Sequence, residues 1–317
     1  MQLAQLKIRG LPKLPDTGWI ALKPRLSIIR TPDTERARHL IRAIQSINPP
    51  WDCRREHPFQ SIPAETNTVS GYRKRIAPSK RTIALAVFNC PPSLITELGA
   101  LFDPLYETDR IEVGRRLDYS RWMNFVEMAS STRWSDVSEA IDQLAEYGSG
   151  IGMTDQSIRR LIAGMKRTDR IKGESMQQLD HWLNRLRARH PSPGTIDDLI
   201  GTVNRAAYFA EARRIVEQRM PIFLTCGVDT VSALSAHSTE NEDSEADRFP
   251  PVWIMDVLDE SDTRATQLLD SWARDTARNQ TICFINNQCR LHQGLHQYVV
   301  PDILTSAAGE PVSRLAR

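Results

Sequence analysis

The sequence lacks long hydrophobic runs, an apolar leader and a regular set of cysteines. Its longest apolar stretches, such as Ile83–Phe88, fall far short of the roughly 20 residues that cross a bilayer. The first residues alternate between apolar and polar side chains and do not form the core of a signal peptide. Five cysteines, odd in number and scattered, do not make a secreted disulfide framework, so we expect reduced thiols. We therefore expect a cytoplasmic protein with no membrane partner.

Motifs of common catalytic and metal sites are also absent. There is no G-x-S-x-G nucleophile elbow and no recognisable grouping of Ser, His and Asp. Cys289, His292 and His296 have ligand-like spacing, but no C-x-x-C pair accompanies them, and Cys283 lies in a predicted buried strand. The glycine-rich segment Gly148–Gly152 precedes a helix without a clear strand before it, which favours a linker over a phosphate cradle. We predict no metal site.

The sequence does have the composition of a folded protein, with its charges unevenly distributed. Of its 317 residues, 40% are hydrophobic and 25% are charged, enough for a core in one large domain or two ordinary ones. The net charge of +2 conceals a basic segment, Arg54–Arg81, and an acidic one, Pro221–Gln280. A basic patch could meet phosphates or an acidic partner, or be only a solvated surface. Composition leaves these alternatives open.

Hydrophobic periodicity predicts strands at both ends of the chain and helices between them. Residues 2–10 alternate as a half-buried strand does, and Leu26–Arg30 is typical of a buried strand. From residue 93 to 219 the apolar residues recur every three to four positions, as in helices. Buried strands return at Pro251–Met255 and Thr281–Ile285. The pattern predicts an α/β core, residues 1–92 and 221–317, with a helical lobe, residues 93–220, inserted between its halves.

A strand, a turn and a helix are predicted in order within Leu26–Ile44. This segment resembles the ATPase heads of the ABC class, specifically the SMC, RecF and DNA-repair branch. The first motif of that family reads like L-N-x-I-x-G-x-N-G-x-G-K-S/T-x-L-L-x-A-I, and the two patterns align without a gap. The matching apolar positions are Leu26, Ile28, Ile29, Leu40, Ile41, Ala43 and Ile44. The resemblance implies a P-loop-NTPase-like mixed sheet, as in an ABC or SMC head.

The residues that perform the chemistry in that family are missing from this motif. The three glycines are replaced, and the β-carbons of Thr34 and Arg36 would crowd a loop whose amides bind phosphate. Ala37 stands at the position of the phosphate-binding lysine, and Arg38 at that of the magnesium-binding Ser or Thr. The degenerate positions of this segment are Thr31, Asp33, Thr34, Arg36, Ala37 and Arg38.

The last third of the chain resembles the remaining family motifs in part. Leu224–Val228 stands near the expected place of the L-S-G-G-E signature. Val252–Met255 followed by Asp256 resembles the Walker B strand, with Val257 in place of the glutamate that polarises the attacking water. Asn286 ends the next predicted strand, where the family has its switch histidine. These positions are also degenerate.

The resemblance implies a catalytically inactive ABC/SMC-like homologue. We interpret it as a structural or regulatory subunit of a nucleic-acid-processing or genome-defence complex. Because heads of this family work in pairs with nucleotide at the interface, the expected partner is an active ATPase or a second copy of this chain. No cofactor is expected, and ATP with magnesium is disfavoured.

Two alternatives stay open. One is a nucleic-acid-binding module for DNA or RNA, whose candidate contacts are Arg73, Lys74, Arg75, Lys80, Arg81, Arg159, Arg160, Lys166 and Arg167. The other is a weak residual ATPase that uses a shifted acidic pair, Asp259 and Glu260, with a phosphate charge from Arg36 or Arg38. Asp256 is preferred to the shifted pair because it follows the predicted strand directly.

Overall fold

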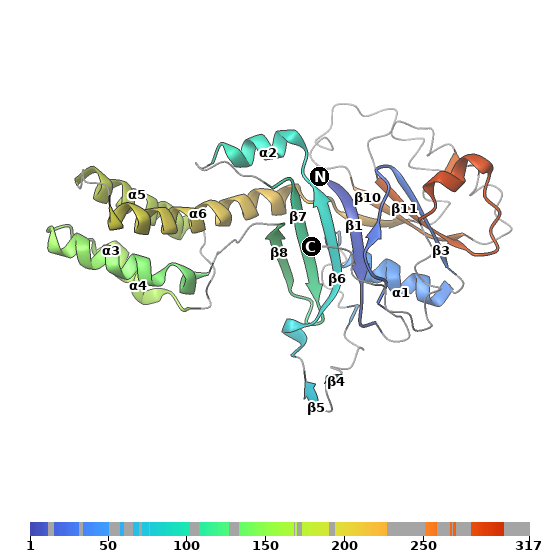
Figure 1. Ribbon diagram of the computed structural model, residues 1–317, viewed down its shortest axis with the longest axis horizontal. Helices are drawn as coiled ribbons and strands as arrows, with labels where there is room; N and C mark the ends of the chain where they lie inside the picture. Colours follow the sequence, from blue (N-terminus) through green and yellow to red (C-terminus); the bar gives the residue numbers. More distant parts are fainter. Residues whose placement is uncertain are drawn as a thin grey trace. The chain divides into compact units, whose positions relative to one another are not determined.

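The computed structural model describes residues 1–11, 16–31, 34–50, 58–59, 66–69, 72–75, 77–101, 108–126, 133–167, 169, 173–189, 194–226, 251–258, 267, 269–270 and 280–300. The chain divides into two compact units. The sheet unit comprises Met1–Pro91, Asp109–Asn124 and Arg219–Arg317, and the helical unit comprises Pro92–Thr108 and Phe125–Gln218. Parallel strands, antiparallel strands and helices are all present (Figure 1), so the predicted α/β class is confirmed.

An antiparallel sheet in the sheet unit has the strand order β2-β1-β6-β7-β8. Its strands are β1 (Gln2–Ile8), β2 (Ile20–Ala21), β6 (Thr82–Asn89), β7 (Arg110–Arg116) and β8 (Arg121–Phe125). The central strand β6 is buried along its length except at Asn89, as its unbroken apolar sequence predicts. It pairs antiparallel with both β1 and β7.

The strands β7 and β8 lie within residues 93–219, which the sequence predicted to be mostly helical. In β7 the buried residues Ile111 and Val113 alternate with half-buried charged ones, as in a strand with one covered face. Gly114 allows a close approach, because a Cβ there would lie 2.2 Å from Cε2 of Trp122. Charged residues break the apolar pattern of these short strands, so the longer helical periodicity around them dominates the prediction.

A second sheet, all parallel, has the order β3-β11-β10-β9. Its strands are β3 (Leu26–Thr31), β9 (Phe223–Cys226), β10 (Val252–Leu258) and β11 (Gln280–Asn286). Helix α1 (Thr34–Gln45) follows β3 and contacts β10, β9 and β3. Its buried residues, Ala37, Leu40, Ile41, Ala43 and Ile44, form the apolar stripe expected of a helix covering a sheet.

A buried glutamine joins the two sheets. Gln280, at the start of β11, accepts a hydrogen bond from the backbone N–H of Leu3 (2.9 Å) and donates one to the Leu3 carbonyl (2.7 Å). Its amide also donates to the Lys23 carbonyl at 3.0 Å. The side chain thus supplies backbone-like partners at the irregularity of β1 between Leu3 and Gln5. These bonds satisfy groups that would be costly to bury alone.

The carboxyl end of α1 is held by an arginine from β7. The Arg115 guanidinium donates to the carbonyl oxygens of Ser46 (2.6 Å), Ile47 (3.1 Å) and Tyr119 (2.7 Å). It also lies over the Tyr119 ring, 4.5 Å from the centroid. Carbonyls at a helix end lack intrahelical partners, so this buried cation satisfies them and complements the helix dipole.

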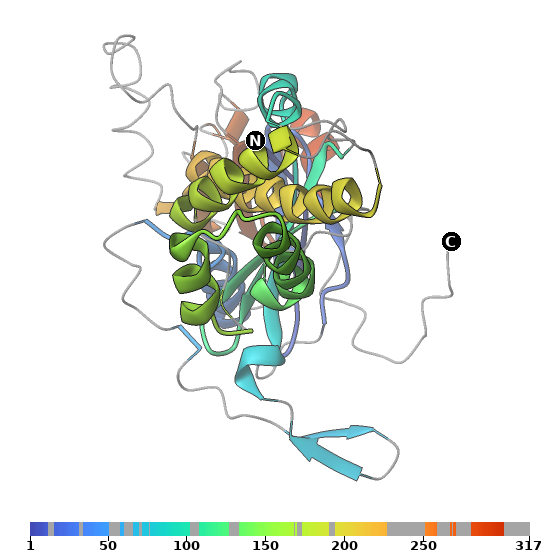
Figure 2. The same cartoon turned by 90° about the vertical axis from the view of Figure 1, so that its left-hand side faces the viewer.

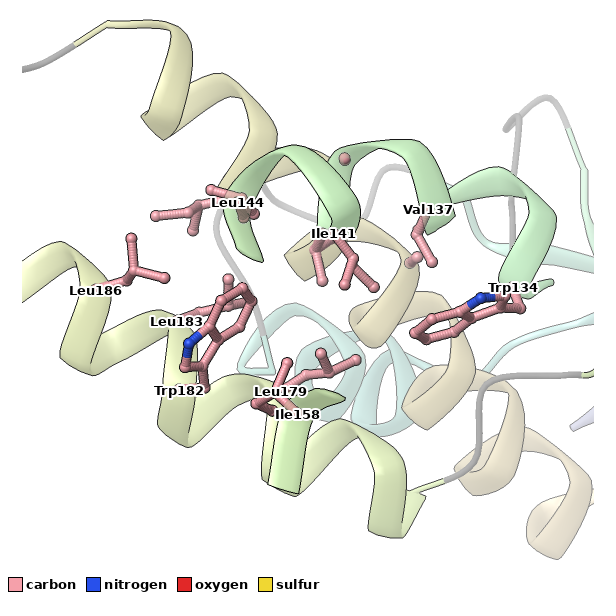
Figure 3. Packing of buried hydrophobic residues seen from close by; sticks show 13 residues of the cluster. Trp134, Val137, Ile141, Leu144, Ile158, Leu179, Trp182, Leu183 and Leu186 are labelled. Atoms are coloured by element: carbon pink, nitrogen blue, oxygen red, sulfur yellow. The ribbon is translucent and has the colours of Figure 1, made fainter. Parts of the chain in front are cut away.

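The helical unit contains α2 (Pro92–Gly99), α3 (Ser138–Gly150), α4 (Gln156–Gly164), α5 (Gly173–Arg189) and α6 (Thr195–Arg219, which ends at the unit boundary). Helices α3 to α6 contribute to one apolar cluster (Figure 2; Figure 3). Its labelled side chains in Figure 3 are Trp134, Val137, Ile141, Leu144, Ile158, Leu179, Trp182, Leu183 and Leu186. The predicted apolar stripes of this segment therefore face one another.

Candidate functional site

The chain leaves the ends of the neighbouring strands β3 and β11 in opposite directions. After β3 the chain enters α1, which contacts β10 and β9. After β11 it passes through the short helix η5 (Gln293–Tyr298) and returns beside β3, where Val299 bridges Ile28. In open parallel sheets, such a switch of direction opens a crevice at the carboxyl ends of the strands, where ligands bind. The candidate site therefore lies where β3 and β11 end.

Different elements cover the two faces of the parallel sheet. On one face, Leu269 and Leu295 pack into a buried cluster whose other members are Leu26, Ile28, Met255, Cys283, Ile285 and Cys289. Among the described residues, α1 contributes none to this cluster. Because strand residues alternate between faces, we place α1 on the opposite side. The chain thus leaves β3 and β11 on different faces.

The connection from β3 to α1 is very short. The strand ends at Thr31 and the helix begins at Thr34, so two residues separate them. Those two, Pro32 and Asp33, lie outside the described residues. Arg36, Ala37 and Arg38 are consequently part of the helix. Ala37 is fully buried, whereas Arg38 is exposed.

Hydrogen bonds tie the ends of β3 and β11 together. Thr31 and Asn286 are register partners, and the backbone N–H of Asn287 donates to the Thr31 carbonyl at 3.1 Å. The Arg30 guanidinium donates to the carbonyl oxygens of Asn287 (3.0 Å) and Cys289 (3.3 Å). The Asn286 side-chain oxygen accepts from the backbone N–H of Gln288 at 3.1 Å. The chain's own groups therefore engage this edge of the sheet.

The Walker B-like positions lie one strand further along. Asp256 and Val257 are in β10, which pairs in parallel with β11. The register shifts between Met255 and Leu258, so these two positions sit at an irregularity that periodicity does not predict. Thr31, Asn286 and Asp256 thus belong to three adjacent parallel strands. Asp259, Glu260 and the last part of Leu224–Val228, from Gly227, lie outside the described residues.

The predicted basic contacts are divided between the two units. Arg73, Lys74 and Arg75 lie in β5 (Tyr72–Arg75), which pairs antiparallel with β4 (Thr66–Val69) to form a two-stranded ribbon in the sheet unit. Lys80 is exposed nearby in the chain, whereas the Arg81 guanidinium is half-buried and donates to the Gly10 carbonyl at 2.8 Å.

The other four predicted contacts belong to the helical unit. Arg159 and Arg160 are exposed on α4, and Lys166 and Arg167 are exposed in the turn that follows it. The sequence prediction did not include three further exposed arginines, Arg185, Arg187 and Arg189, which α5 contributes. Their spacing among apolar residues in one helix is the signal that could have identified them.

The described free cysteines are buried, and the described residues include no group of metal ligands. Burial raises the pKa of the Cys90 thiol to about 12, so it holds its proton at neutral pH. Cys283 and Cys289 are buried in the apolar cluster under β3 and β11. Within the part of the chain that the structure describes, no three His, Cys, Asp or Glu residues are grouped as metal ligands. Nor do the described helices include one long and apolar enough to cross a membrane.

Comparisons with known proteins give a structural likeness but no match by sequence. No protein-family model and no curated protein matches this chain. Among solved structures, the SMC head domain from Thermotoga maritima is similar, with 13% sequence identity and a TM-score of 0.32. The alignment covers 91% of this chain and 90% of that one.

Proposed function

We propose that this chain is a catalytically inactive relative of ABC/SMC-type ATPase heads that acts as a structural or regulatory subunit. The complex it serves would process nucleic acid or defend a genome. The observation that carries the proposal is the two-residue connection between β3 and α1, with Ala37 buried behind it. The topological switch lies where a nucleotide would bind, but the local chain does not suit phosphate.

A phosphate-binding loop needs several consecutive amides outside a helix and a cation among them. Here the helix has already begun at Thr34, so the position equivalent to the third glycine, Arg36, has helical geometry. The position equivalent to the lysine, Ala37, belongs to the apolar stripe that α1 buries. A lysine there would have to leave the core to reach a ligand. The short connection thus supports loss of the phosphate site beyond the loss of individual residues.

The charges near the end of β3 and the start of α1 also disfavour phosphate binding. Glu35 places a carboxylate in the first turn of α1, where it complements the positive end of the helix dipole and would repel phosphate. The Arg30 guanidinium, the cation at the end of β3, is already engaged by two carbonyl oxygens. The chain's own groups therefore take up the interactions that a nucleotide would use.

A subunit of this kind would associate with its partner independently of ATP. The partner is an active ATPase or a second copy of this chain. We expect the sedimentation coefficient of the purified chain to be the same with and without Mg·ATP. ATP-dependent dimerisation in the ultracentrifuge would contradict the proposal.

The direct test is isothermal titration calorimetry of the full chain with ATP and magnesium, followed by a phosphate-release assay. We expect no binding heat and no turnover. Micromolar binding with magnesium-dependent turnover that Asp256→Ala and Glu260→Ala abolish would establish the residual ATPase instead. Asp142→Ala is the matched control, because it removes an exposed carboxylate from α3 in the helical unit.

A further inference from the structure

Basic residues of the helical unit are concentrated in α4, α5 and the segment between them. Between residues 156 and 189, which span α4 and α5, the sequence has nine Lys and Arg and three Asp and Glu. Helix α3 has the opposite character, since it has no Lys or Arg, and its exposed acids Glu139, Asp142 and Glu146 are spaced to share one face. One side of this unit is therefore positive and α3 is negative.

Packing leaves the basic residues of α4 and α5 on the solvent side. Ile158 of α4 and Leu179, Trp182, Leu183 and Leu186 of α5 are buried in the cluster that the helices share. The basic residues between them are exposed, as the opposite face of an amphipathic helix must be. The two helices also contact each other.

An ion pair sets how the two helices align. The carboxylate of Asp155, at the start of α4, accepts from Nη1 of Arg185 near the end of α5 at 3.2 Å, so the helices run antiparallel. Arg189 lies one turn beyond Arg185 on the same face of α5, and Arg159 lies one turn beyond Asp155 on α4. Because the helices are antiparallel, Arg159 and Arg189 lie on opposite sides of this ion pair, about two helical turns apart along the axis.

The turn after α4 supplies the other end of the surface. The backbone N–H of Trp134 donates to the Asp169 carbonyl (2.8 Å), and that of Ser135 donates to the Arg167 carbonyl (3.0 Å). The Asp169 carboxylate accepts from the backbone N–H of Lys166 at 2.9 Å. These bonds hold the turn in place, so Lys166 and Arg167 extend from a defined backbone.

Four of these cations make no side-chain ion pair within the described part of the chain. Arg160, Lys166, Arg167 and Arg189 form no ion pair with another described residue. We define the α4–α5 surface as Arg159, Arg160, Lys166, Arg167, Arg185 and Arg189. At 1.5 Å per residue, its cations extend over roughly 10–15 Å along α4, a span that matches a few successive phosphates.

We propose that the α4–α5 surface binds the phosphate backbone of nucleic acid without reading its sequence. Among the residues whose burial the structure describes, the exposed large hydrophobic ones are Trp19, Leu101, Ile151 and Ile222, which all lie outside α4 and α5. In its described part, the surface thus lacks the apolar and aromatic centre of a protein–protein interface. Arginine dominates it, and its planar guanidinium suits phosphate oxygens. This activity is separate from the proposed nucleotide loss, because it uses the helical unit alone.

The test measures binding of the full chain to a fluorescent 20-base-pair DNA duplex across a salt series, without ATP. We expect micromolar affinity at low salt, typical of contacts to phosphate. The variant Arg160→Gln/Lys166→Gln/Arg189→Gln should bind at least about 10-fold more weakly, with the slope of log K against log salt reduced by about 3. A single strand of the same length shows whether a duplex is required.

The matched control is Arg42→Gln/Arg205→Gln/Arg290→Gln, which removes the same charge from exposed positions outside the surface. It should bind nearly as the unmodified chain does, and circular dichroism should show both variants folded. An equal loss of DNA affinity in the two variants would show that net charge alone determines binding, and it would overturn the proposal. Loss confined to Arg73→Gln/Lys74→Gln/Arg75→Gln would assign binding to the ribbon. Competition by polyglutamate as strong as by DNA would favour an acidic polypeptide.

Discussion

In the sheet unit, buried polar side chains bridge segments far apart in the sequence, whereas in the helical unit the polar contacts between helices lie at the surface. Gln280 bonds to Leu3 across 277 positions, and Arg115 bonds to Ser46 across 69. In the helical unit, the ion pairs Arg185–Asp155 and Arg187–Asp197 involve partly or fully exposed side chains. The interior of that unit is apolar.

The difference follows from how each unit is assembled. The sheet unit brings together strands from both ends of the chain, and directional hydrogen bonds define which backbone groups meet. The helical unit joins helices that follow one another, so matching apolar stripes suffice to pack them. Buried hydrogen bonds should therefore contribute more to stability in the sheet unit, and buried apolar volume more in the helical unit.

The largest expected effect is in the helical unit. Trp182→Ala removes a fully buried indole from the shared cluster and should lower the free energy of unfolding by about 3–5 kcal/mol. Urea titration followed by circular dichroism measures it. His181→Ala, an exposed neighbour on the same helix, should change stability by less than about 0.5 kcal/mol. Similar losses from both variants would show that the cluster does not stabilise this unit.

The next largest expected effect on stability is in the sheet unit. Arg115→Met keeps the apolar volume but leaves the carbonyls of Ser46 and Ile47 without their cation, and should cost about 3 kcal/mol. The same urea titration tests it. Arg116→Met is the control in the adjacent position, where the guanidinium is less buried and bonds to Ser120. A cost as large at Arg116 would argue against a specific role for buried polar bonds.

The smallest expected effect is at the N-cap of α4. Asp155→Ala should cost about 1 kcal/mol, whereas Asp155→Asn keeps an acceptor and should cost less. Hydrogen bonds from Ser157 lower the pKa of Asp155, so its contribution is present above the unfolded-state pKa and is lost as pH falls through the folded-state value. The gap between Asp155→Ala and the unmodified chain should narrow from about pH 6 to about pH 3. An unchanged gap would contradict this.

Segments dominated by one kind of side chain were predictable from the sequence. The largely apolar strands β3, β6, β10 and β11 and the striped helix α1 were all predictable, because burial on both faces or on one stripe leaves a simple pattern. Strands β7 and β8 were not predicted, because arginines interrupt their short alternation of apolar and polar residues. One of these, Arg115, is buried through hydrogen bonds that the sequence does not reveal.

For the candidate site, the residues could be predicted individually, but their arrangement could not. Thr31, Asp256 and Asn286 could each be predicted near the end of a strand from local pattern alone. Their placement on three adjacent parallel strands depends on the strand order, and the switch point depends on the return of Val299 to β3. The pairings of β3 with β11 and of Ile28 with Val299 join residues more than 200 positions apart, and one sequence does not specify them.

By itself, the sequence determined which chemical groups are available: apolar strands and helix stripes, a motif without its lysine and glycines, and separate basic and acidic segments. Only the tertiary structure decided that two residues separate β3 from α1, that Ala37 faces the core, and that Asp155 at the start of α4 meets Arg185 of α5. The physical reason is that side-chain chemistry is a local property, whereas burial, strand pairing and electrostatic potential depend on distant segments that fold against each residue.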